Sequence, residues 1–141
     1  MTSDFLIRSG TWQELAVDAK AIREAVFIQE QNITPEDEWD DLDAVSVHFV
    51  MYAQNQPIAT ARLLPSHSIG RVAVLETHRG LKIGQKIMQA VIEYAQQQQR
   101  PFLKLSSQVH AIGFYQALGF TVQGEEYLDC GIPHIDMYMN L

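Results

Sequence analysis

The chain has 141 residues, of which 47% are hydrophobic, and a chain of this length and composition typically folds as one domain around one core. We therefore expect a single domain over residues 1–141. Its 10 basic and 17 acidic residues give a formal net charge of −7, which argues against a nucleic-acid partner. The one cysteine excludes an intrachain disulfide and a cysteine-based metal site. No stretch is typical of an export signal or a membrane span, so we expect a cytoplasmic protein without membrane contact or bound metal.

The first quarter of the chain predicts a short strand followed by a helix. Phe5 to Ile7 is rich in β-formers, and Thr11 and Glu14 have the spacing of a capping box. Apolar residues then recur every three or four positions, as on one face of a helix: Leu15, Ala19, Ile22 and Val26. The helix should end before Pro35, because the residue before a proline disfavours helical dihedrals.

Residues 36–43 hold six carboxylates in eight positions. Their spacing does not match a calcium-binding loop, so a solvated loop is favoured over a metal site. Two arginines, Arg62 and Arg71, lie instead within predicted strands, where an unpaired charge is costly to bury. They either pair with carboxylates in the core or reach an anionic group in a cleft.

The rest of the chain predicts alternating strands and helices. We expect strands over 44–53, 58–64, 69–75, 101–105, 120–122 and 135–139, and helices over 83–97 and 111–118. The fold class is therefore α/β, with a mixed sheet flanked by helices. His48 falls inside a strand and is expected to be a hydrogen-bonded core histidine.

The loop between the strand at 69–75 and the following helix has the properties of a phosphate site. Arg79, Gly80, Lys82 and Gly84 place positive charge and glycines where the start of a helix exposes unpaired amides. In the alternative interpretation, the glycines serve a tight turn and a close contact between helix and strand. The spacing does not fit the nucleotide-binding signatures.

This segment resembles the acyl-CoA diphosphate loop of the GNAT superfamily. Arg79 and Gly84 match the ends of that pattern, while Lys82 stands where its first glycine is usual. The stretch from Phe114 to Phe120 resembles the superfamily element Phe-Tyr-x-x-x-Gly-Phe. Further stretches resemble the ElaA-type branch of the superfamily: residues 27–31, 69–72, 107–108 and 131–137. The resemblance implies a mostly antiparallel sheet with one splayed parallel pair.

It also implies an acetyltransferase that moves an acetyl group from acetyl-CoA to an amine by direct attack. The pantetheine arm would meet the backbone of Val72, Ala73 and Val74, and the phosphates would meet the loop and helix start formed by Arg79, Gly80, Leu81, Lys82, Ile83, Gly84 and Gln85. Tyr115 would protonate the departing thiolate, since a phenol is protonated at neutral pH. In the alternative interpretation, Tyr115 is a core aromatic beside Phe114 and Phe120.

A protonated amine needs a base before it can attack. Glu30 and His134 are the preferred candidates, with His110 as a third, and each has an equally acceptable structural role. Cys130 is disfavoured as a nucleophile. The acceptor amine is not identifiable from the sequence, whether small molecule or protein, and a homodimer is compatible with the resemblance. The second functional hypothesis is a non-catalytic acyl-CoA sensor.

Overall fold

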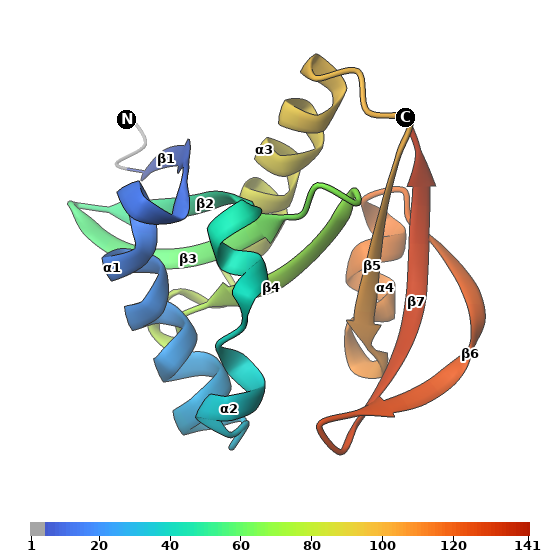
Figure 1. Cartoon of the computed structure of the whole chain (residues 1–141), viewed down its shortest axis with the longest axis horizontal. Coiled ribbons are helices and arrows are strands. Elements are labelled where there is room, and N and C mark those ends of the chain that lie inside the picture. Colours follow the sequence, from blue (N-terminus) through green and yellow to red (C-terminus); the bar gives the residue numbers. More distant parts are fainter. Residues whose placement is uncertain (1–4) are drawn as a thin grey trace.

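The computed structural model describes residues 5–141. Within that part of the chain, seven strands form one mixed sheet in the order β1-β2-β3-β4-β5-β7-β6 (Figure 1). Their bounds are β1 Phe5–Gly10, β2 Val47–Ala53, β3 Gln56–Leu63, β4 Ser68–Val74, β5 Phe102–Gln108, β6 Thr121–Asp129 and β7 Ile132–Asn140. All neighbouring pairs are antiparallel except β4 and β5, which confirms the predicted fold class.

Three of the helices over residues 5–141 begin within one residue of the predicted position, whereas the short helix at Pro35–Glu38 was not predicted. The α-helices are α1 Trp12–Arg23, α2 Pro35–Glu38, α3 Ile83–Gln97 and α4 Ile112–Ala117, and a π-helix, η1 Glu24–Glu30, continues α1. The predicted capping box is present: the Glu14 amide donates to Thr11 Oγ1 at 3.3 Å, and the Thr11 amide donates to Glu14 Oε1 at 2.9 Å. None of the helices over residues 5–141 is long and apolar enough to cross a membrane.

The core lies on both faces of the sheet, because buried residues of β2 alternate between two clusters. Phe49 and Met51 belong to the larger cluster, which includes the buried face of α3. Val50 and Tyr52 point the other way and pack against the apolar stripe of α1. His48 is buried in the same strand, and its Nε2 donates to the Asp43 carbonyl at 2.9 Å, as expected of a core histidine.

A β-bulge in β4 opens the middle of the sheet. Opposite β3, Ala73 pairs with Thr60 and Gly70 with Arg62, so Arg71 and Val72 together face one residue of β3. On its other side, β4 pairs with β5 only at Ser68 and Ile69. The two strands then diverge, and Figure 1 shows the sheet dividing into a β1–β4 half and a β5–β7–β6 half.

The C-terminal hairpin is longer than the sequence pattern predicts. Strand β6 runs to Asp129 and β7 starts at Ile132, whereas the apolar pattern marked only three and five residues of them. The reason is that β6 is an edge strand with mostly exposed side chains, so it carries little apolar alternation. Its register shifts between Gln123 and Tyr127, around Gly124 with φ of 85°.

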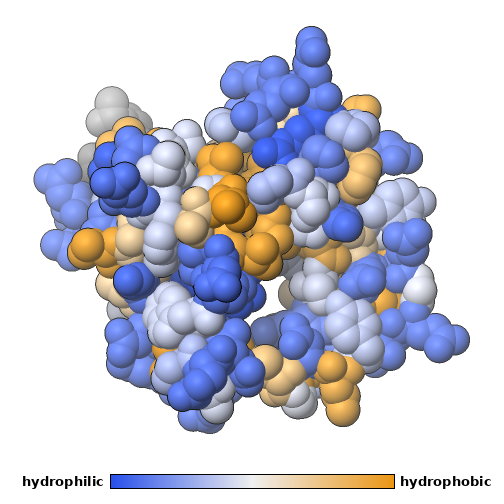
Figure 2. Space-filling model, in the orientation of Figure 1, coloured by the Kyte–Doolittle hydropathy of each residue, from blue (hydrophilic) through white to orange (hydrophobic). Residues whose placement is uncertain are grey.

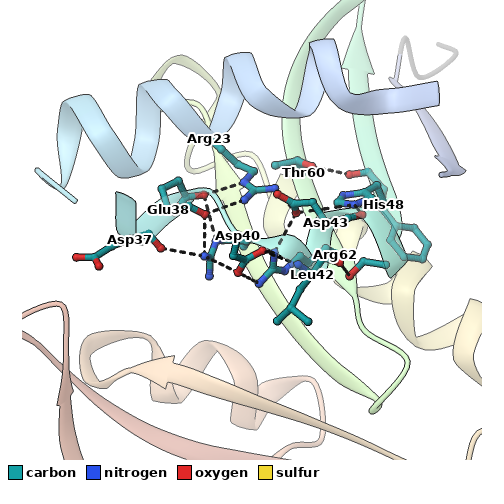
Figure 3. A network of polar contacts seen from close by, with 12 residues as sticks. Arg23, Asp37, Glu38, Asp40, Leu42, Asp43, His48, Thr60 and Arg62 are labelled. Carbon is teal, nitrogen blue, oxygen red and sulfur yellow. Dashed lines mark hydrogen bonds and ion pairs between the residues drawn. The ribbon is translucent and has the colours of Figure 1, made fainter. Parts of the chain in front are cut away.

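The acidic segment is not the solvated loop that its composition favours. It forms α2 and a 3-10 helix, η2 Asp41–Val45, and two of its carboxylates are buried: Glu38 at 2% exposure and Asp43 at 3%. They pair with Arg23 of α1 and with the arginines of β3 and β4 (Figure 3). The prediction is wrong for these two carboxylates, because buried arginines offset the cost of removing them from water.

Candidate active site

A cleft of about 680 Å³ lies between the two halves of the sheet. Figure 2 shows the molecule hollowed between these halves, with hydrophobic side chains gathered beside the hollow. Its walls come from η1, α2, β4, the start of α3, β5, α4 and the turn between β6 and β7. The cleft therefore exists because β4 and β5 separate after two paired residues.

Strand β4 contributes backbone as well as side chains to this cleft. Val72, Ala73 and Val74 line it, and beyond Ile69 the strand has no pairing with β5. An edge of this kind leaves peptide groups available to an extended ligand, which can add as a further strand. These three residues are the ones that the resemblance assigned to the pantetheine arm.

The loop after β4 turns tightly into α3. Gly80 has φ of 80°, and the N-cap residue Lys82 is left-handed, with φ of 61° and ψ of 24°. A lysine thus adopts the conformation for which this pattern usually has glycine. No side chain caps the first turn of α3, so amides at the beginning of this 15-residue helix are left for an anion to meet.

Gly84 lies in the first turn of α3, against α4. A Cβ atom built on it would lie 3.3 Å from Cζ of Phe114 and 3.8 Å from Cγ2 of Val74. All three residues line the cleft. The close-contact interpretation of this glycine therefore agrees with the structure, and it does not exclude an anion site, because the same absence of a side chain keeps the cleft open.

Arg79 and Glu30 form an ion pair at the edge of the cleft. Nη1 and Nη2 of Arg79 donate to the two carboxylate oxygens of Glu30, each at 2.6 Å, and Nε donates to the Val74 carbonyl at 3.0 Å. Hydrogen bonds from Arg79 lower the pKa of Glu30. Glu30 thereby connects η1 to Arg79 in the loop between β4 and α3.

Tyr115 lies on α4, half-buried, with its side chain lining the cleft. Its ring packs edge-on against Phe114 and Phe120, with centroids 5.0 and 6.1 Å apart. Burial raises the pKa of Tyr115 to about 12. The residue is thus both a packed aromatic, as in the alternative interpretation, and a neutral phenol beside the cleft.

His134 is buried at 9% exposure and also lines the cleft. Its Nδ1 lies 2.7 Å from the Ile132 carbonyl. Since a carbonyl only accepts, Nδ1 carries the hydrogen and Nε2 of the neutral ring keeps its lone pair. No residue in the range 5–141 hydrogen-bonds to that Nε2. The ring stacks on Tyr127, whose hydroxyl donates to Asp136 Oδ1 at 2.6 Å and contacts the hydroxyl of Ser106.

Many of the predicted site residues line the cleft, and others lie outside its lining. Those that line it are Val72, Ala73, Val74, Arg79, Gly84, Glu30, Tyr115 and His134. His110 lines it as an exposed residue, and so does Cys130. Those on the loop or helix start outside its lining are Gly80, Leu81, Lys82, Ile83 and Gln85, and the Ile83 side chain belongs to the core.

Sequence reasoning missed contacts that depend on distant elements. Nε2 of Gln108 donates to Oε1 of Gln31 at 3.0 Å, joining β5 to the end of η1, and both residues line the cleft. Ser106 was not predicted as part of the site either, although it lines the cleft too. The sequence does carry a signal for Ser106, because apolar Leu103 and Leu105 alternate with polar Lys104 and Ser106, and alternate residues of a strand share a face.

Known proteins are similar to this chain over most of its length. A family model described as "Acetyltransferase (GNAT) domain" matches residues 16–141. Protein ElaA of Escherichia coli is 38% identical over 125 residues, covering 82% of this chain and 81% of ElaA. The uncharacterised N-acetyltransferase YjcF of Bacillus subtilis is 36% identical over 129 residues, covering 89% and 92%.

Solved structures show the same likeness over almost the whole chain. The crystal structure of E. coli ElaA has a TM-score of 0.87 at 31% identity, covering 96% of this chain and 99% of ElaA. An acyl-CoA N-acyltransferase from Pseudomonas aeruginosa has a TM-score of 0.83 at 30% identity, covering 98% and 99%. The chain therefore belongs to the GNAT acetyltransferase family. Within it, the likeness to ElaA in sequence and structure supports the ElaA-type branch.

Proposed function

We propose that this acetyltransferase takes its acetyl group from acetyl-CoA and transfers it directly to an amine, without a covalent enzyme intermediate. The observation that carries the proposal is the meeting, in one cleft, of an unpaired β4 edge, the start of α3 and the Tyr115 phenol. An acyl-CoA N-acyltransferase is also among the similar structures, at 30% identity.

The two ends of the cleft suit the two ends of acetyl-CoA. The uncapped start of α3 attracts the diphosphate through its amides and dipole, and the N-cap residue Lys82 adds positive charge there. The edge of β4 offers peptide groups to the amides of the pantetheine arm. A backbone amide near Val72 to Val74 then polarises the thioester carbonyl and stabilises the oxyanion of the tetrahedral intermediate.

Transfer requires two proton movements. The neutral amine attacks the carbonyl carbon, a C–N bond forms, the C–S bond breaks, and the amine proton leaves to a base. Tyr115 is protonated at neutral pH, since burial raises its pKa to about 12, and it donates its proton to the departing thiolate, whose developing negative charge it stabilises.

Of the two preferred bases, we propose His134. Its Nε2 lone pair has no hydrogen-bond donor within residues 5–141. The Glu30 carboxylate, in contrast, accepts two hydrogen bonds from Arg79. His134 can therefore take the amine proton directly or through a water molecule. The acceptor is proposed only as an amine, and a cytoplasmic location is proposed with it.

The test is thiol release from acetyl-CoA with a panel of polyamines, amino acids, aminoglycosides and lysine-containing peptides. At least one amine should raise CoA production above the hydrolytic background. With that amine, Tyr115→Phe should lower kcat by about a hundredfold while calorimetry shows an unchanged Kd for CoA. Tight acetyl-CoA binding with no turnover for any amine would favour the sensor hypothesis instead.

A further inference from the structure

Three arginines and three carboxylates form a closed ring of alternating charge beside the cleft. Glu38 bridges Arg23 and Arg71, Asp40 bridges Arg71 and Arg62, and Asp43 bridges Arg62 and Arg23, with N to O distances between 2.7 and 3.3 Å. Figure 3 shows Arg23, Glu38, Asp40, Asp43 and Arg62 converging between α1, the acidic segment and the sheet. The ring therefore joins α1, β3 and β4 to the acidic segment.

Arg71 differs from the other two arginines in its backbone. It is the bulge residue of β4 and has φ of 53°, whereas regular strands have negative φ. Its side chain also makes more hydrogen bonds to α2 than Arg23 does, because Nη2 donates to the Asp37 carbonyl at 3.3 Å in addition to two contacts with Glu38. Nε donates to Glu38 Oε2 at 3.1 Å, and Nη2 donates to the Glu38 carbonyl at 2.8 Å and to Asp40 Oδ2 at 3.3 Å.

The position of this strained residue matters for the cleft. The pairing of β4 with β5 ends at Ile69, two residues before Arg71. The β4 residues from Ile69 to Val74 line the cleft, so Arg71 itself lines it and the unpaired edge Val72–Val74 follows directly. A change in the dihedrals of Arg71 would rotate the peptide groups of Val72 and Ala73. An arginine has no intrinsic preference for this conformation, so something outside the residue must hold it.

We propose that Arg71 is a positioning residue: its guanidinium, fixed by Glu38 and Asp40, holds the left-handed bulge that aims the β4 peptide groups into the cleft. This inference rests on the proposed function, since it concerns the peptide groups that would meet the thioester. The charge ring then keeps α2 and β4 in one arrangement.

Two substitutions at one position separate this role from a direct contact with substrate. Arg71→Ala removes the guanidinium and keeps a Cβ atom that disfavours positive φ, whereas Arg71→Gly removes the same guanidinium and adopts positive φ freely. With acetyl-CoA and the best amine of the panel, kcat should fall about tenfold for Arg71→Ala and less than threefold for Arg71→Gly. The Kd for CoA should rise more for Arg71→Ala than for Arg71→Gly, because the pantetheine arm would pair with the peptide groups of Val72 to Val74, whereas the loop over 79–85 is untouched in both.

Gln99 supplies a matched control pair. It has φ of 60° and is exposed after the end of α3, outside the cleft. Gln99→Ala and Gln99→Gly make the same backbone change there, so both should keep kcat within twofold of the unsubstituted protein. Equal losses for Arg71→Ala and Arg71→Gly would overturn the proposal in favour of direct substrate contact, and full activity in both would overturn it as well.

A measurement without ligand tests the positioning role of Arg71 separately from the proposed acetyl transfer. Amide hydrogen exchange of residues 70–74 should be faster in Arg71→Ala than in Arg71→Gly, with thermal unfolding used to show that both variants fold. Failure of the unsubstituted protein to bind CoA or acetyl-CoA would defeat the proposed function alone. Identical exchange in the two Arg71 variants would defeat the positioning role alone.

Discussion

Glu30 and Arg79 meet through two hydrogen bonds of 2.6 Å each, although 49 residues separate them in the chain. The pair spans the edge of the cleft from the π-helix η1 to the loop that precedes α3. An arginine so engaged is already neutralised by a counter-charge, and a carboxylate so engaged is a weak base, because accepting hydrogen bonds stabilises its ionised form.

Glu30→Gln should therefore change kcat by less than about threefold and leave the shape of the pH–rate profile intact, because the base is a different residue. The KM for acetyl-CoA should change more than kcat, since Arg79 loses its partner. Thiol-release kinetics between pH 6 and 9 measure kcat, its pH dependence and the KM for acetyl-CoA. Glu24→Gln, at an exposed position of the same π-helix, is the control. A hundredfold loss of kcat in Glu30→Gln would instead identify Glu30 as the base.

Arg23→Ala should cost about 3–5 kcal/mol of unfolding free energy, because it leaves Glu38 and Asp43 buried and short of a counter-ion. The Arg23 side chain is 1% exposed and lies over the rings of Trp12 and Trp39. Urea unfolding measures the loss. Arg79→Gln breaks an exposed ion pair and should cost about 1 kcal/mol or less. Similar costs for the two variants would contradict the burial argument.

His48 should make the protein less stable as the pH falls below about 6.5. Burial lowers the pKa of His48, with Arg23 and Arg62 acting in the same direction against the neighbouring Asp43. The unfolded state thus takes up a proton that the folded state resists, and the stability present above the unfolded pKa is lost at lower pH.

His48→Gln keeps a donor for the Asp43 carbonyl and removes the titrating ring. Its unfolding free energy should change less between pH 7 and pH 5 than that of the unsubstituted protein, by at most about 1.4 kcal/mol per pH unit. Urea titrations at several pH values measure this slope. Parallel slopes for the two proteins would mean that other groups dominate.

Gly84→Ala should weaken acetyl-CoA binding by about tenfold or more while changing stability little. The new methyl group would lie 3.3 Å from Cζ of Phe114, closer than an ordinary van der Waals contact, and would narrow the cleft there. Alanine is also the better helix former by about 1 kcal/mol, which limits the loss of stability. Calorimetry and thermal unfolding check the two halves of this prediction. Gly113→Ala is the matched control, because a Cβ atom at Gly113 meets nothing within 4 Å, and it should leave binding unchanged.

Local patterns predicted the elements that depend on local physics. The capping box of Thr11 and Glu14 is present, and α3 has the predicted bounds, because caps and apolar periodicity act within a few residues. The edge strand β6 was predicted too short, since its exposed side chains need not be apolar. The left-handed Lys82 was not foreseeable from residue type, because the turn around it imposes that conformation.

The charge ring was beyond sequence reasoning for a different reason. Its members lie up to 48 positions apart, and composition alone cannot assign which carboxylate meets which arginine. The signals were nevertheless present: Arg62 and Arg71 fell within predicted strands, and Arg23 falls four residues after Ala19 of the apolar stripe. Burial of the acidic segment follows once those arginines are known to face it.

The exposed outer edge of β6 bears on how the protein behaves at high concentration. A free strand edge invites intermolecular pairing, and natural proteins discourage it with charge and irregular twist. Here the shifted register around Gly124 coincides with two adjacent acids, Glu125 and Glu126. Like charges on approaching chains repel, and the register shift prevents the edge of β6 from pairing along its whole length. These two features protect the edge of β6 against aggregation.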